Sequence, residues 1–150
     1  MILKNKNEQL EKQGNINNIE IKIYGTIEKN GYFRKSTNIE KINFCKLAGQ
    51  SENYFCVINY YSEYKNNEIQ SEDIMIFEKR KEINANIFSG EKNIYIVKYE
   101  EEIKICKLED TGDYILVKDL NISSKTVVLG KNDRYKLKII GKLEKNIRSY

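Results

Sequence analysis

The sequence predicts a mainly β domain, and two features of the chain support this fold class. Short apolar runs recur along it, and clusters of turn-forming residues separate them, as at 65–67, 89–91 and 111–113. The first run also alternates apolar and polar residues with the period of a half-buried strand. With 150 residues, of which 40% are hydrophobic, the chain can bury one core. We therefore expect a single domain.

The N-terminal arm and the first strand differ in pattern. Residues 1–18 are rich in Asn, Lys, Gln and Glu and carry few apolar side chains, so we expect a flexible arm or one short helix. From residue 19 an apolar residue or glycine recurs at every second position, at Ile19, Ile21, Ile23, Gly25 and Ile27. This period predicts a strand with one buried face, and it opens the β domain expected over residues 19–150.

Further apolar runs have the length of short strands, at 54–58, 74–77, 94–99, 103–108, 114–117, 126–129 and 135–143. Three glutamates join the runs at 94–99 and 103–108, and this short connection predicts a β-hairpin. On the second strand of that hairpin Ile103, Ile105 and Lys107 share one face, while Cys106 lies on the other.

The composition excludes several kinds of active site. The chain has no histidine, so catalytic triads and metal sites that need an imidazole are ruled out. Cys45, Cys56 and Cys106 form no close pair of the kind that binds zinc, and their odd number fits a reducing compartment. Glycine-rich phosphate loops and EF-hand loops are also missing from the sequence. We expect no metal and no cofactor.

Charge and hydropathy bear on partners and location. The chain has 26 Lys and Arg against 22 Asp and Glu, and the two signs alternate, so nucleic-acid binding is not directly implied. No apolar run reaches the roughly 18 residues of a membrane span, and we expect a cytoplasmic protein without a membrane partner. The tyrosines at positions 54, 60, 61 and 64 leave two interpretations open: a base-stacking platform, or ordinary strand packing, which is the commoner.

Four segments, in a fixed order, carry a likeness to a known family. They are a strand with an internal glycine at 21–27, an aromatic-led strand at 54–63, an acidic turn and strand at 69–77, and the hairpin strand at 103–108. In this order they resemble the self-cleaving serine peptidase domain of LexA-type repressors and UmuD-like proteins. A closing strand at 135–148 is similar to the family's last strand. The resemblance implies a LexA-like β fold, of the signal-peptidase kind, built from short strands and hairpins.

The resemblance also implies a self-cleavage site, from which this chain departs. Ser62 stands at the place of the family's nucleophile, but without the Gly-Asp before it or the Met after it. Cys106 stands at the place of the catalytic lysine, and Lys107 follows, so a dyad of Ser62 and Lys107 needs a one-residue slip in register. The loop at 28–31 replaces the usual scissile dipeptide. A lysine base, with its pKa lowered by burial, suits a chain without histidine.

Three functions remain open from the sequence. The first is a non-catalytic LexA-like dimerisation or interaction module, a pseudo-peptidase in a transcription-regulatory, phage or SOS-like stress-response setting. It would pair with itself, through the region of about 135–150, or with a regulatory protein. The second is an autoprotease in which Ser62 and Lys107 cut the loop at 28–31. The third is a small nucleic-acid-binding β domain that uses the tyrosines. We favour the first, because nucleophile, base and scissile bond are all altered together.

Overall fold

The computed structural model describes residues 18–37, 40–45, 51–64, 69–80, 93–121 and 125–148. The first half of the chain supplies β1 (Asn18–Ile27), β2 (Phe33–Lys35), β3 (Lys41–Cys45), the 3-10 turn η1 (Ser51–Asn53), β4 (Tyr54–Asn59) and β5 (Ile74–Lys79). The second half supplies β6 (Ile94–Tyr99), β7 (Glu102–Asp110), β8 (Tyr114–Asp119), β9 (Val127–Gly130), the 3-10 helix η2 (Lys131–Lys136) and β10 (Leu137–Ile147). The prediction of a mainly β fold is confirmed.

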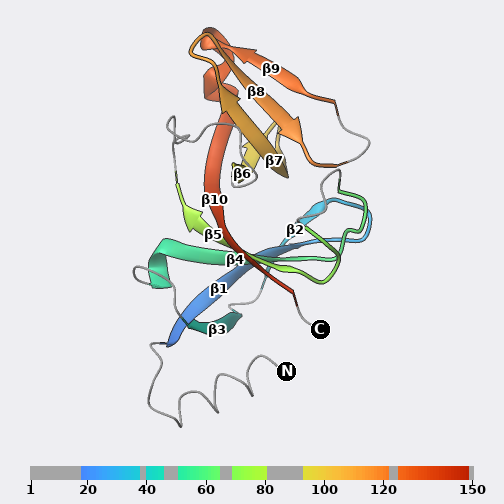
Figure 1. The fold of residues 1–150 in the computed structure, drawn as a ribbon, viewed down its shortest axis with the longest axis vertical. Coiled ribbons are helices and arrows are strands. Elements are labelled where there is room, and N and C mark those ends of the chain that lie inside the picture. Colours follow the sequence, from blue (N-terminus) through green and yellow to red (C-terminus); the bar gives the residue numbers. More distant parts are fainter. Residues whose placement is uncertain are drawn as a thin grey trace.

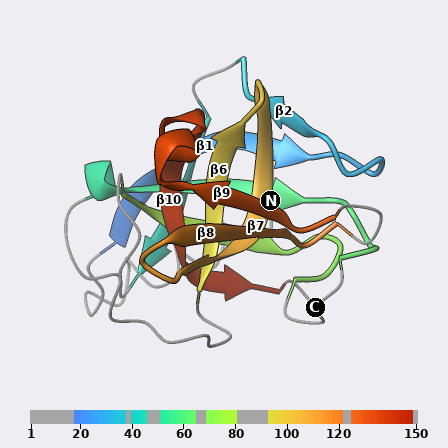
Figure 2. The same cartoon turned by 90° about the horizontal axis from the view of Figure 1, so that it is seen from above.

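All ten strands belong to one sheet, in the order β2-β1-β4-β5-β10-β6-β7-β8-β9, with β3 also paired to β1. Among the described pairs only β1 and β4 run parallel. Figure 1 shows β10 running from the group β6–β9 down to the group β1–β5. In the view from above, β6 and β7 run across β1 and β4 (Figure 2), so the sheet folds over on itself.

The alternation in the first strand positions the core as the sequence predicts. Ile21, Ile23 and Ile27 are buried, whereas Glu20 and Lys22 are exposed. Each buried isoleucine side chain removes apolar surface from water, which stabilises the fold by about 2 kcal/mol per residue. The strand therefore follows the hydrophobic period.

Three clusters of buried side chains fill the fold. The central one joins the two halves of the chain, because Phe55 and Phe77 from β4 and β5 share it with Ile96 and Ile105 from β6 and β7. A second cluster lies within the first half, around Ile21 and Cys56, and a third within the second half, around Tyr95 and Cys106.

The closing strand begins later than its sequence pattern predicts. Its first two predicted residues, Tyr135 and Lys136, belong to η2. Ion pairs hold that turn: Lys136 lies 3.2 Å from Asp133, and Arg134 makes two hydrogen bonds, of 2.9 and 3.1 Å, with Asp110.

Strands β2 and β3 have no apolar run in the sequence, and the sequence analysis does not predict them. Of the arm expected over residues 1–18, Asn18 is the first residue of β1, and the remainder lies outside the described residues, as do the expected turns at 65–67 and 89–91. No helix in the described ranges is long and apolar enough to cross a membrane.

The ion pair between Asp110 and Arg134 should contribute to stability in a pH-dependent way. The hydrogen bond from Arg134, followed by one from the Gly112 amide, lowers the pKa of Asp110 below its usual range. A lowered folded-state pKa stabilises the fold above the unfolded-state pKa of about 3.9, and that contribution is lost as pH falls through the folded value. We expect Asp110→Asn to lower the free energy of unfolding by about 1 kcal/mol at pH 7.

Urea unfolding at several pH values checks this prediction. The deficit of Asp110→Asn should be constant between about pH 7 and pH 5 and should shrink below about pH 4. Asp113→Asn is the control, because Asp113 is 82% exposed and its ion pair with Lys131 spans 3.9 Å. An equal deficit for both variants, or no pH dependence, would contradict the assignment.

Candidate functional site

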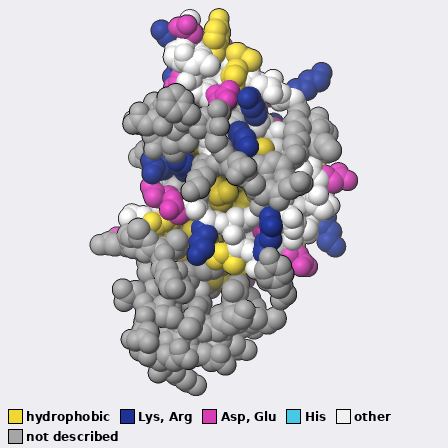
Figure 3. Space-filling model, in the orientation of Figure 1, with side chains coloured by type: hydrophobic (Ala, Val, Ile, Leu, Met, Phe, Trp, Pro, Cys, Tyr) yellow, Lys and Arg dark blue, Asp and Glu magenta, His cyan; other side chains and the backbone are white. Residues whose placement is uncertain are grey.

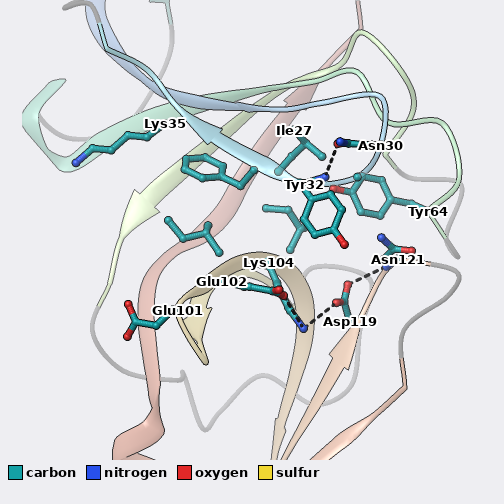
Figure 4. A pocket seen from close by; sticks show the side chains of 14 residues that line it. Ile27, Asn30, Tyr32, Lys35, Tyr64, Glu101, Glu102, Lys104, Asp119 and Asn121 are labelled. Carbon is teal, nitrogen blue, oxygen red and sulfur yellow. Dashed lines mark hydrogen bonds and ion pairs between the residues drawn. The ribbon is translucent and has the colours of Figure 1, made fainter.

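A hollow of about 430 Å³ opens between the β1–β2 turn and the start of β7, and we call it the β7 basin. Its walls come from residues Asn30–Phe33 of the turn, from Tyr64, from Glu101–Ile105, from Asp119 at the end of β8 and from Asn121 after it. Figure 4 shows the side chains of Asn30, Tyr32, Tyr64, Lys104, Asp119 and Asn121 gathered from segments far apart in the sequence. Its polar lining is the main cluster of charged groups that the fold brings together at a described cavity.

One wall of the basin is a tight turn. The Glu28 amide donates to the Tyr32 carbonyl, and the Gly31 amide donates to the Glu28 carbonyl, both at 2.9 Å. Gly31 has a φ of +89°, and a Cβ there would lie 2.8 Å from Nδ2 of Asn121, so only glycine fits. This is the loop at 28–31 where the resemblance implies a scissile bond, and it lies at the rim of the basin.

The opposite wall is an edge of β7. Strand β6 pairs with β7 over Glu102–Lys107, but β8 pairs with it only from Cys106 onward. The Ile105 carbonyl faces away from β6, because it accepts a bond of 3.1 Å from the Leu120 amide. Two residues earlier, the backbone groups of Ile103 point the same way, toward the basin, and no described strand is hydrogen-bonded to them.

Charged side chains surround this edge. Nζ of Lys104 lies 3.7 Å from Oδ2 of Asp119 and 3.5 Å from Oε2 of Glu102, as the dashed lines in Figure 4 mark. Oδ1 of Asp119 accepts a hydrogen bond from the backbone amide of Asn121. The two ion pairs hold Lys104 near two carboxylates. Burial, and then the charge of Asp119, raise the pKa of the Tyr64 hydroxyl above its usual value.

The segment that contains Ser62 is organised by a buried asparagine. The side-chain amide of Asn59 donates to the carbonyls of Tyr61 and Gln70, at 2.8 and 2.9 Å, and its oxygen accepts from the Tyr61 amide. Tyr61 then donates to Oδ1 of Asn121 at 2.9 Å, which ties the segment to the basin wall.

The acidic turn before β5 is held by Asp73, which is only 1% exposed. Its carboxylate accepts from the Gln70 amide and from Nδ2 of Asn146, both at 2.7 Å, and lies 3.4 Å from Nε of Arg148. Asn146 belongs to β10, so Asp73 fastens the end of the chain to this turn. A buried carboxylate with this many donors is a structural anchor.

The predicted site residues lie apart from the basin wall. The side chain of Ser62 is exposed, and Lys107 is half-buried on β7, opposite Ile94 and Lys118. Neither residue is among the described residues that line the basin. The structure does bring the loop at 28–31 to the basin, across from the start of β7.

Cys106 is fully buried in the cluster around Tyr95. Burial is the main cause that raises the pKa of its thiol, and the nearby charge of Asp119 adds to it. A thiol is nucleophilic only as the thiolate, so Cys106 is unreactive at neutral pH. It therefore serves as a residue of the core.

The tyrosine cluster divides between core and surface. Tyr54 and Tyr61 are buried, and Tyr64 packs edge-on against Tyr61 with ring centroids 4.9 Å apart. Only Tyr60, at 37% exposure, presents a ring to solvent. Three of the four side chains therefore contribute to packing.

The basin residues Lys104, Asp119 and Asn121 were missed by the sequence analysis. The sequence pattern around Lys104 is typical of a solvent-exposed lysine on a strand. The pattern around Asp119 and Asn121 is typical of the polar end of a strand. Only the pairing of β7 with β8 brings Asp119 across from Cys106 and within reach of Lys104. No group of His, Cys, Asp and Glu in the described part of the chain is placed to hold a metal ion.

No protein-family model matches the chain, and no curated protein matches it at a significant level.

Proposed function

We propose that this protein is a non-catalytic interaction module, LexA-like in kind, that holds an extended segment of a partner protein in the β7 basin. One observation carries the proposal: at Ile103 the edge of β7 turns away from β6 beside a cavity, and no described strand is hydrogen-bonded to it there. An extended peptide can add to such an edge through backbone hydrogen bonds, while its side chains enter the cavity. The turn at Asn30–Phe33 would cover the added segment from the other side.

The chemistry of the basin supports binding without cleavage. A serine nucleophile needs a base within hydrogen-bond reach, and Ser62 does not line the basin. The lysine that does line it, Lys104, is engaged by Asp119 and Glu102. Cys106, at the place of the family's catalytic lysine, has no basic side chain. The resemblance places such a module in transcription regulation or a stress response, with a regulatory protein as its partner.

Replacement of Ile103 by proline tests the proposed peptide site. Proline removes the outward amide of Ile103 and leaves the bonds to β6 in place, because proline is tolerated where the amide faces away from the ladder. The probes are extended 12-residue peptides selected on the wild-type chain from a random display library. We expect about tenfold weaker binding to Ile103→Pro, from the loss of a backbone hydrogen bond and from steric exclusion, measured by fluorescence polarisation.

Ile103→Val is the matched control, and it should bind the selected peptides as tightly as the wild-type chain does. Amide shifts confined to the segment around Glu102–Ile105 should accompany binding in NMR spectra. Peptides that bind Ile103→Pro at full affinity, or a selection that yields no binder, would refute the site.

Incubation at about pH 10 tests for the alternative function, self-cleavage. Lysine amines lose their protons near this pH, so a lysine base would be active there. We expect mass spectrometry to find the full-length chain intact, with Ser62→Ala indistinguishable from the wild type. A cut at 28–31 that disappears in Ser62→Ala would make the protein an autoprotease and overturn the proposal.

Self-association is the second part of the proposed function, and the sheet favours β9 as its means. Strand β10 is bonded to β5 over Gly141–Ile147 and to β6 over Leu137–Lys142, so only part of each of its edges is open to a second copy. Strand β9 is the last in the sheet, and Val128 on it is 56% exposed beside Leu116 of β8. An uncharged edge strand of this kind can pair with a second copy.

A charge on this edge should weaken the dimer. We expect Val128→Lys to raise the dimer dissociation constant at least tenfold in sedimentation equilibrium, since the two added charges would face each other. Tyr60→Lys adds the same charge at an exposed site away from β9 and should leave the constant unchanged. A wild-type chain that stays monomeric at high micromolar concentration would rule out this part of the proposal.

A further inference from the structure

A second hollow, of about 490 Å³, lies where β1, β4 and the end of β5 meet β10. It shares no described lining residue with the β7 basin. Aromatic and aliphatic side chains form most of its surface, and three cations stand at its rim. We call it the bulge pocket; its described lining is Lys22, Tyr24, Tyr54, Phe55, Lys79, Arg80, Ile139 and Ile140.

Two β-bulges build this pocket. In the pairing of β1 with β4, Tyr24 is the extra residue between Ile23 and Gly25. In the pairing of β10 with β6, Ile140 is the extra residue between Ile139 and Gly141. A bulge turns a side chain away from the regular face of its strand, and such bulges are frequent beside binding sites. Both extra side chains line the same pocket.

The apolar part of the pocket is preformed. Phe55 stacks on Phe77, with ring centroids 5.5 Å apart, and meets Tyr24 edge-on at 5.2 Å. A Cβ at position 141 would lie 2.8 Å from the Phe55 ring, so Gly141 is what allows this ring to lie against β10. A rigid apolar surface costs a ligand little ordering free energy.

The charged rim has more cations than anions. Lys22, Lys79 and Arg80 line the pocket; Glu78 offsets part of this charge, since it lies 3.0 Å from Arg80. The backbone amide of Arg80 donates to the Ile140 carbonyl, which anchors the arginine at the second bulge. Nε of Arg80 is buried, and no hydrogen-bond acceptor meets it among the described residues.

Lys142 of β10, two residues after Ile140, is a further cation near Arg80. Burial, and then the charge of Arg80, lower the pKa of this lysine, although Glu144 and Glu78 act in the opposite direction. In the middle of the face drawn in Figure 3, exposed hydrophobic side chains lie among Lys and Arg side chains.

We propose that the bulge pocket binds a small amphipathic organic anion, a carboxylate with an aliphatic body. The body would lie on Phe55 and Ile140, and the carboxylate would meet the cations at Lys79 and Arg80. The volume is in the range of small-molecule sites, which are mostly apolar with a few polar groups that fix orientation. Arginine suits such a head group because it presents several donors to a carboxylate.

Octanoate is the probe for this site, titrated into the isotope-labelled full-length chain and followed by NMR. We expect saturable shifts at the amides of residues 22, 55, 80 and 140, at sub-millimolar octanoate. Acetate has the head group without the body, and octyltrimethylammonium has the body with the opposite charge. Both should bind at least tenfold more weakly.

Charge variants separate a built site from general attraction to a basic protein. Arg80→Gln and Lys79→Gln should each weaken octanoate binding about fivefold. Glu78→Gln should strengthen it, because it removes the carboxylate that competes for Arg80. Lys131→Gln removes the same charge at the far end of β9 and should leave binding unchanged. Lys79 is exposed, so its variant remains informative if Arg80→Gln fails to fold.

Three outcomes would overturn the proposal. They are equal binding of octyltrimethylammonium, an equal effect of Lys131→Gln, or binding of an acidic, leucine-containing peptide at this face in the absence of octanoate binding. The last would assign the pocket to a protein partner. Ile103→Pro should leave octanoate binding intact, so this test and that of the β7 basin fail independently.

Discussion

The backbone pairing of β10 is the constraint on which the rest of the structure depends. This strand bonds to β5 along one part of its length and to β6 along another, and it thereby joins two groups of strands into one sheet. It can do so only because it bends, and the register shifts beside Ile140 and Glu144 supply the bend. The fold-over of the sheet, the central cluster around Phe55 and Phe77, and the bulge pocket all follow from that path.

The buried polar groups have a complementary role, because they fix segments that no strand pairing holds. Asn59 and Asp73 satisfy the backbone around the connection between β4 and β5, and Asp73 also fastens β10 through Asn146. Tyr61 and Asn121 carry the same network to the wall of the β7 basin. Each of these groups costs free energy to bury unless it is bonded, so the network selects one arrangement of the connection.

The two cavities differ in chemistry and suit different ligands. The β7 basin combines a strand edge that has no described hydrogen-bonded neighbour with charges of both signs, since Lys104 lies near Asp119 and Glu102. A polypeptide backbone can satisfy such an edge. The bulge pocket has an apolar surface and an excess of positive charge, which favours a compact anion over a peptide backbone.

The sequence by itself determined the mainly β class, most of the strands and the buried face of β1. These features depend on local hydrophobic period and on turn residues, which any short window of the chain displays. The faces of the β6–β7 hairpin followed in the same way, including the position of Lys107 beside Ile105. Strands β2 and β3 were not predicted, because each pairs with β1 and neither has an apolar run of its own.

Only the tertiary structure decided which polar residues meet. Lys104 and Asp119 come together through the register of β7 against β8, and the loop at 28–31 joins them because β1 and β2 turn beside the start of β7. The bulge pocket depends on two register shifts between strands distant in sequence. Pairing register is a property of two strands at once, so no pattern within either strand specifies it.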